Sequence, residues 1–356
     1  MIKVHNSNQV RAILLALCAA LLAGFNAPLS KLLLSNIDPL FMAALLYLGC
    51  GTGVLIFRFL RNLFSGNKLR ESRISREDFP WLAGATLAGG VAAPIVMQFS
   101  LRETPAATAS LLLNFEAVAT TLIAWLFFHE AINRNAWWAV AVITGASIFL
   151  SLEIEGGWGL SLGAVGIMMA CVLWGVDNNF TRNIAAKDPM DIVMVKGLAA
   201  GSVSLALAFL SGRPLPDFDF VIWALVLGAA SYGLGIVLYV LAQRELGAAR
   251  TSALFSASPL AGIILSFLLF RDTSPVKLLV GIPLVMFGTI LLLFDQHGHS
   301  HTHVLTTHSH AHNHDDQHHN HIHKSVIFGK HAHTHEHEQL IHDHPHTPDT
   351  HHRHTH

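Results

Sequence analysis

Long apolar segments alternate with short polar ones along most of the chain, and this pattern ends near Phe294. A transmembrane helix needs about 20 residues to cross the hydrocarbon layer of a membrane. Segments of that length predict helices over residues 12–34, 39–57, 80–101, 107–128, 136–153, 161–185, 189–210, 221–242, 251–270 and 276–294. We therefore expect an all-α polytopic membrane protein with ten transmembrane helices.

The composition agrees with a membrane location. Hydrophobic residues make up 52% of the chain, charged residues 13%, and the mean hydropathy is +0.47, whereas about a quarter of a soluble chain is charged. Cys18, Cys50 and Cys171 all lie in apolar stretches without CxxC spacing, which argues against a disulfide framework or a cysteine zinc site. The sequence shows no phosphate-binding loop and no nucleophile arrangement, so we expect neither an enzyme nor an ATP-driven pump.

Lysine and arginine predict the orientation, because these residues are enriched in cytoplasmic loops. With a cytoplasmic N-terminus, thirteen of them fall in inner loops and five in outer loops. The sequence thus predicts a cytoplasmic N-terminus over residues 1–11. Since the number of predicted spans is even, the segment after the last one, residues 295–356, is predicted to be cytoplasmic as well.

The spans form two similar halves, residues 12–153 and 161–294. Arg102-Glu103 recurs as Arg244-Glu245, an offset of 142 residues, and Asp38-Pro39 recurs as Asp188-Pro189. Each half has an odd number of spans, so the second half enters the membrane from the opposite side. Such a 5+5 inverted repeat is typical of secondary transporters.

Residues 104–130 resemble the EamA domain of the drug/metabolite transporter superfamily. The second copy, residues 247–272, keeps the proline usual in the middle of that helix as Pro259, whereas the first copy has Glu116-Ala117 there. The resemblance implies a ten-helix exporter of small solutes. Residues 295–356 form a histidine-rich tail. An EamA-type chain with such a tail resembles the CnrT-type nickel and cobalt resistance proteins, which implies metal efflux across the inner (plasma) membrane of a bacterium.

The tail carries 23 of the 25 histidines. HxH spacing lets neighbouring imidazoles converge on one ion, and neutral imidazole suits Ni(II), Co(II), Zn(II) and Cu(II). With so little apolar content we expect the tail to be disordered without metal, and to bind metal mainly above about pH 6.5, where imidazole is neutral. The alternative is a solvated tail without a physiological role. The predicted metal ligands are His297, His299, His301, His303, His308, His310, His312, His314, His318, His319, His321, His323, His331, His333, His335 and His337.

Ionisable residues at membrane depth are costly and mark candidate sites. The two predicted halves align Asp177 with Asn26 and Glu116 with Ser258. The first and sixth spans, and likewise the fourth and ninth, would therefore bring one carboxylate and one neutral oxygen ligand toward the midplane. Two carboxylates can hold a divalent cation or, after it leaves, protons. The alternatives are structural: an ion pair of Glu116 with Lys196, and a hydrogen bond of Asp177 to a helix end or to Asn178. The predicted pathway residues are Glu116, Asp177, Asn26, Asn178, Ser258 and Lys196.

The function expected from these features is secondary-active efflux of nickel, and also of cobalt, by proton antiport, conferring metal resistance. An exporter of amino acids or metabolites with a metal-sensing tail is one alternative, and a membrane-anchored metal-storage protein is another. Expected partners are membrane lipid and divalent metal ions, with a homodimer left open, and without nucleic acid or a prosthetic group. The glycine-rich stretches 49–53 and 84–90 are expected to allow close helix approach.

Overall fold

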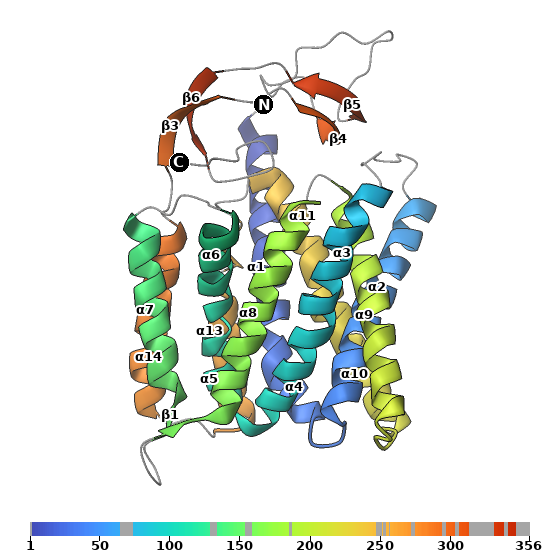
Figure 1. Ribbon diagram of the computed structural model, residues 1–356, viewed down its shortest axis with the longest axis vertical. Helices are drawn as coiled ribbons and strands as arrows, with labels where there is room; N and C mark the ends of the chain where they lie inside the picture. Colours follow the sequence, from blue (N-terminus) through green and yellow to red (C-terminus); the bar gives the residue numbers. More distant parts are fainter. Residues whose placement is uncertain are drawn as a thin grey trace.

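The helices lie side by side in one bundle, and the strands of the tail lie beyond the end of the bundle where α1 begins (Figure 1). The computed structural model describes residues 2–64, 74–128, 134–153, 159–184, 187–246, 251, 254–255, 257–271, 275–293, 297–302, 306–312, 331–337 and 341–346.

Helices occupy each of the ten predicted spans, in whole or in part. The first five contain α1 (Ile2–Leu33), α2 (Pro39–Phe64), the run η1 (Arg76–Asp78), α3 (Phe79–Ala85), η2 (Thr86–Ala92) and α4 (Ala93–Glu103), then α5 (Ala106–Leu112) with α6 (Phe115–Phe128), and α7 (Arg134–Ser151). The last five contain α8 (Leu162–Arg182), α9 (Pro189–Leu210), the run α10 (Phe218–Gly228), η3 (Ala229–Leu234) and α11 (Gly235–Leu246), then α13 (Ser258–Leu269) and α14 (Pro275–Leu293). Two short strands, β1 (Leu152–Glu153) and β2 (Gly159–Leu160), pair between α7 and α8.

Among the described residues, seven helices are long and apolar enough to cross a membrane, and two shorter apolar helices cover Ser258–Leu269 and Pro275–Leu291. The distribution of side chains fits a lipid environment. Large apolar residues such as Phe127, Ile264 and Leu279 are exposed, while many of the buried residues are small. The prediction of an α-helical membrane protein is therefore confirmed.

Interruptions of three spans were not predicted. The span predicted over residues 107–128 is two helices, α5 and α6, separated by a turn at Leu113–Asn114. The third and eighth spans contain the π-helical segments η2 and η3. These segments end at Ala92 and Leu234, which are 142 residues apart, the offset that relates the two halves in the sequence.

Helices α2 and α9, one from each half, begin in the same way. Asp38 and Asp188 each accept a hydrogen bond at 2.9 Å from the backbone nitrogen two residues later, and in each case a proline follows the aspartate. This is an N-cap with proline at the first helical position, a strong helix start.

Each of these aspartates also faces an arginine at the far end of the other helix. At one end of the pair, Arg213 lies 3.5 Å from Asp38. At the opposite end, Arg58 forms an ion pair with Asp191 and lies 4.0 Å from Asp188. The two antiparallel helices are thus joined by opposite charges at both ends.

Glycines let α2 pack closely against its neighbours, which confirms that prediction for the glycine-rich stretches. A Cβ atom added at Gly51 would lie 2.6 Å from the backbone nitrogen of Leu198 on α9, and one at Gly49 would collide with the carbonyl of Leu225 on α10. In the other stretch, a Cβ atom at Gly90 would lie 2.7 Å from that of Ala200. Small residues allow such backbone contacts inside membranes.

The tail contains four strands, β3 (His297–Thr302), β4 (Thr306–His312), β5 (His331–His337) and β6 (Ile341–His346). β3 pairs with β6 and β4 with β5, both antiparallel. The sequence predicts disorder for the metal-free tail and no strands. The described residues of the tail form only these two-stranded pairs, which are marginal without an apolar core to pack on. The bundle thus consists of helices, and the strands of the tail lie outside it.

Candidate functional site

Asp177 and Lys196 form an ion pair inside the bundle. Lys196 Nζ lies 2.5 Å from Oδ1 and 2.7 Å from Oδ2 of Asp177, and only 15% and 9% of the two side chains are exposed. Thr181 donates a further hydrogen bond of 2.9 Å to Asp177 Oδ1. The carboxylate on α8 is thus held by a cation from α9 and by a hydroxyl from its own helix.

Glu116 has a neutral partner instead. Asn178 donates from Nδ2 to Glu116 Oε1 at 2.8 Å and to Thr120 Oγ1 at 3.1 Å. The alternative ion pair of Glu116 with Lys196 is therefore not the contact seen, because the ammonium group binds Asp177. The alternative hydrogen bond between Asp177 and Asn178 is also not the one seen, since neighbouring residues on a helix point about 100° apart.

Glu116 occupies the first turn of α6, directly after the break in the fourth span. The first residues of a helix leave backbone N–H groups without helical partners, and the helix dipole favours a negative charge there. All seven residues of α5, before the break, are buried. The break thus places a carboxylate at a polar helix end in the middle of an otherwise apolar span.

Gly89, in the π-helical segment η2, was missed as a site residue. Its carbonyl oxygen accepts hydrogen bonds from Tyr47 Oη at 2.6 Å and from Trp174 Nε1 at 3.0 Å. A Cβ atom at Gly89 would collide with the carboxylate of Asp177. The sequence signal was the glycine-rich stretch, but it did not indicate which glycine would contact the aspartate.

Asn26 makes the repeat-related contact. It donates to Ser231 Oγ in η3 at 2.7 Å, and Ser231 is 142 residues after Gly89. The Asn26–Ser231 contact thus has the repeat-related position of the Asp177–Gly89 contact. The rings of Tyr47 and Tyr232 lie 5.5 Å apart and connect the two contacts. Tyr232 also comes within 3.5 Å of Asn26 Oδ1.

Ser258 lies at the start of α13, and its carbonyl oxygen faces Gly24 of α1, where a Cβ atom would collide with it. The corresponding contact in the other half joins Gly175 of α8 to Ala119 and Thr120 of α6. The structure therefore places Ser258 at the helix contact that matches the one beside Glu116. Its side chain is half-buried.

The cluster offers several oxygen atoms. Two carboxylates, two asparagine amides and several hydroxyls come from both halves, and the charges of Asp177 and Lys196 are near enough to act on Glu116. Within the part of the chain that the structure describes, no group of three or more His, Cys, Asp or Glu side chains forms a closed metal site. Oxygen atoms of side chains from both halves thus lie together inside the bundle.

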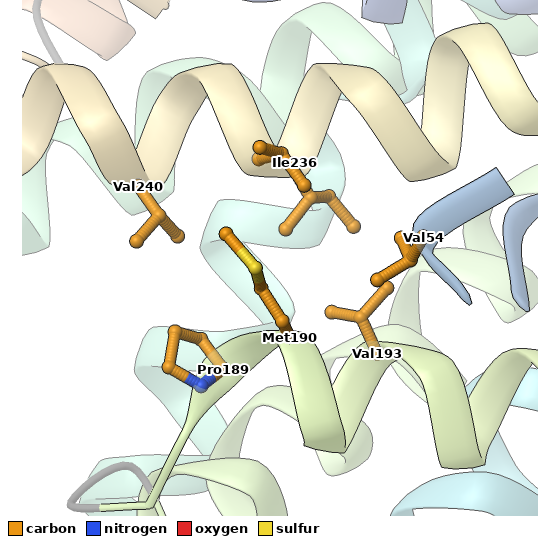
Figure 2. Close-up of a pocket in the computed structure, with 7 residues that line it drawn as sticks. Val54, Pro189, Met190, Val193, Ile236 and Val240 are labelled. Atoms are coloured by element: carbon orange, nitrogen blue, oxygen red, sulfur yellow. The ribbon is translucent and has the colours of Figure 1, made fainter. Parts of the chain in front are cut away.

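An apolar pocket lies away from this cluster, between α2, α9 and α11 (Figure 2). Met190 extends from α9 toward the helix that carries Ile236 and Val240, next to Val54 and Val193 (Figure 2). None of the six predicted pathway residues lines this pocket, so it does not form part of the candidate site.

The predicted metal ligands of the tail are placed only in part. His303, His314, His318, His319, His321 and His323 lie outside the described residues. The others fall on β3, β4 and β5, where the backbone register sets His308 opposite His335 and His310 opposite His333. Metal binding by the tail stays a prediction.

Comparison with known proteins agrees with the fold. A model of the EamA-like transporter family matches the chain twice, over residues 10–152 and 161–294. A protein of Methanothermobacter thermautotrophicus named an uncharacterized transporter is 28% identical over 290 residues, which are 78% of this chain and 84% of the relative. Another uncharacterized transporter, from Clostridium kluyveri, is 25% identical over 243 residues, 63% of this chain and 75% of the relative.

A protein crystal structure aligns with a TM-score of 0.56 at 18% identity, and covers 79% of this chain and 95% of that chain. This likeness shows the fold alone. The names of the two relatives give no substrate, and the resemblance to CnrT-type proteins stays a prediction. The nature of the cargo therefore has to be inferred from the polar cluster and the tail.

Proposed function

Because the chain belongs to the EamA-like transporter family, we propose that it exports divalent transition-metal cations, nickel first and cobalt second, in exchange for protons. It is a multi-pass membrane transporter, and the proposal concerns its cargo. We further propose that the protein lies in the inner membrane of a bacterium and that both termini are cytoplasmic. Residues 12–153 and 161–294 would form two inverted five-helix halves.

The observation that carries the proposal is the pair of carboxylates, Glu116 and Asp177, in one polar cluster inside an apolar bundle. Carboxylates at membrane depth are costly and are kept where they bind ions or protons. Oxygen ligands on helices broken near the midplane are a common cation site in secondary transporters. Protons compete with the metal for the same oxygens, which would couple the two fluxes.

The tail supports the metal as cargo without forming part of the pathway. Its HxH arrays offer imidazole, a ligand suited to nickel and cobalt. The strands β3 to β6 of the tail lie beyond the end of the bundle where α1 begins (Figure 1). There the tail would buffer the metal or deliver it to the inner mouth of the transporter. Transport through the bundle should therefore continue without it.

The test is metal loss from nickel-loaded cells that produce the intact protein, a deletion of residues 297–356, or the double variant Glu116→Gln/Asp177→Asn. We expect the intact and the tail-deleted proteins to speed nickel loss, and the double variant to fall to the background, because it removes both charges that bind the cation. The matched control is Asp217→Asn/Asp219→Asn, which removes two carboxylates exposed at the start of α10 and should keep the intact rate.

If none of the four proteins changes nickel or cobalt loss although all reach the membrane, metal efflux is wrong. If only the tail deletion abolishes metal retention and no protein exports metal, the chain is a metal-storage protein.

One observation favours export of an amino acid as the second candidate. Lys196 and Asp177 present both charge signs within one cluster, beside Tyr47 and Trp174, and a zwitterion carries the complementary pair. Release of amino acids into the medium by the same four strains separates this candidate from metal efflux.

A further inference from the structure

Lys196 binds both carboxylate oxygens of Asp177, and in the proposed function that carboxylate binds the metal. The pair is bidentate, at 2.5 Å and 2.7 Å, and mostly buried. The backbone of Gly89 closes one side of Asp177. In the conformation described, a metal ion can therefore reach both oxygens of Asp177 only if the ammonium group moves away.

The other charged groups around the cluster do not duplicate this contact. Glu116 is bound by the amide of Asn178, and the ion pairs found in the described part of the chain place no cation on it. Lys277 binds the carbonyls of Leu150 and Leu152 near a helix end, and Arg58 faces the aspartates at the start of α9. Lys196 is thus the cation that neutralises the candidate site.

A carrier must change between its inward-open and outward-open conformations both with cargo bound and without it. With a metal ion bound, the charges of the carboxylates are balanced by the ion. Without it, the proton of the proposed exchange can neutralise Glu116, and Asp177 then needs a second cation, because a bare carboxylate in a low-dielectric interior costs several kcal/mol. A lysine side chain is a compact charge on a flexible four-carbon stem, so it can leave the carboxylate and return while its helix stays in place.

We propose that Lys196 is a tethered cation that takes the place of the metal at Asp177 and so allows the empty transporter to reorient. This inference rests on the proposed function and adds the reason why net export can occur. The metal displaces the ammonium group when it binds, and the ammonium group returns when the metal leaves. Lys196 then determines whether the carrier completes a net cycle or only exchanges one metal ion for another.

The experiment uses the purified full-length protein in nickel-loaded vesicles that contain radioactive nickel. Net efflux is measured into nickel-free buffer, and exchange into buffer with unlabelled nickel. For Lys196→Met we expect net efflux to fall at least about tenfold, the effect of a barrier higher by about 1.4 kcal/mol. Exchange should stay near that of the intact protein, because only the loaded form has to reorient.

The matched control is Lys277→Met, which removes another partly buried lysine, one bound to backbone carbonyls. The ratio of net efflux to exchange should stay unchanged in it. If Lys196→Met lowers net efflux and exchange equally, or lowers neither, the inference is wrong. If the intact protein moves nickel in neither assay, the proposed function itself fails.

A second variant applies if Lys196→Met does not reach the membrane. Lys196→Arg keeps the charge but offers a rigid fork that matches a carboxylate better. The metal should then displace the side chain less readily, so the nickel concentration for half-maximal efflux should rise several-fold while the ratio of net efflux to exchange is kept. An unchanged concentration would contradict a competition between Lys196 and the metal.

Discussion

At the scale of single residues, Gly89 has the most constrained position in the polar cluster. Its carbonyl oxygen holds Tyr47 and Trp174, and its α-carbon leaves no room for a side chain next to Asp177. A π-helical turn displaces the regular hydrogen-bond ladder, and such turns are frequent at functional sites. The backbone of Gly89 therefore packs directly against the carboxylate of Asp177.

Gly89→Ala should lower nickel efflux in vesicles at least about tenfold, because the new methyl group pushes the Asp177 carboxylate away from Lys196, and a small misplacement of a reactive group can have that effect. The matched control is Gly145→Ala on α7, where an added Cβ atom meets nothing within 4 Å, so efflux should be kept. Intact efflux in Gly89→Ala, at equal protein abundance, would refute this positioning role.

The sequence predicts the ionisable residues of the candidate site but not their pairing. Glu116, Asp177 and Lys196 stand out because charges are rare at membrane depth. Which carboxylate the lysine joins depends on the packing of α9 against η2 and on the rotation of α8, and neither can be derived from hydropathy. The contact with Gly89 is likewise a property of the packed bundle.

At the scale of elements, the broken fourth span sets the position of Glu116. In the second half, Pro259 lies in the first turn of α13, where a missing N–H group breaks no helical bond. In the first half, the corresponding Ala117 donates to Asn114 O at 3.2 Å. The break in the fourth span therefore forms without proline, which is why hydrophobic periodicity predicted one continuous helix there.

Ala117→Pro should be tolerated, because it removes one hydrogen bond worth about 0.5–1.5 kcal/mol at a position in the first turn of α6. Ala124→Pro, in the interior of α6, should cost about 3 kcal/mol or more, because the ring removes a helical bond and clashes with the preceding turn. Thermal unfolding in detergent and abundance in the membrane measure both effects. Equal destabilisation by the two prolines would mean that the helix is continuous at residue 117.

At the scale of the whole molecule, the hydrophobic segments predicted most of the architecture. Each of the ten apolar runs contains helix among the residues that the structure describes, because burial in lipid requires every backbone group to be bonded within its own segment. The tail is different. Its polar sequence offers no core, so sequence alone gave no reason to expect the paired strands β3–β6 and β4–β5.

The predicted orientation can be tested with single cysteines in a protein whose three native cysteines are replaced by serine. Ser211, directly after α9, and Glu77, in η1 just before α3, are both exposed. The end of α9 and the start of α3 lie at opposite ends of the bundle (Figure 1). With cytoplasmic termini, Ser211→Cys should react with an impermeant maleimide in intact cells, and Glu77→Cys only after the cells are opened, because the reagent cannot cross the membrane. The reversed pattern would place both termini outside.

The charges at both ends of the α2–α9 pair have a mechanical consequence. Arg213 faces Asp38 at one end, and Arg58 faces Asp188 and Asp191 at the other. Sliding of the two antiparallel helices along each other would break these ion pairs, whereas a joint tilt would keep them. Since α2 and α9 come one from each half, the same ion pairs also link the two halves of the molecule.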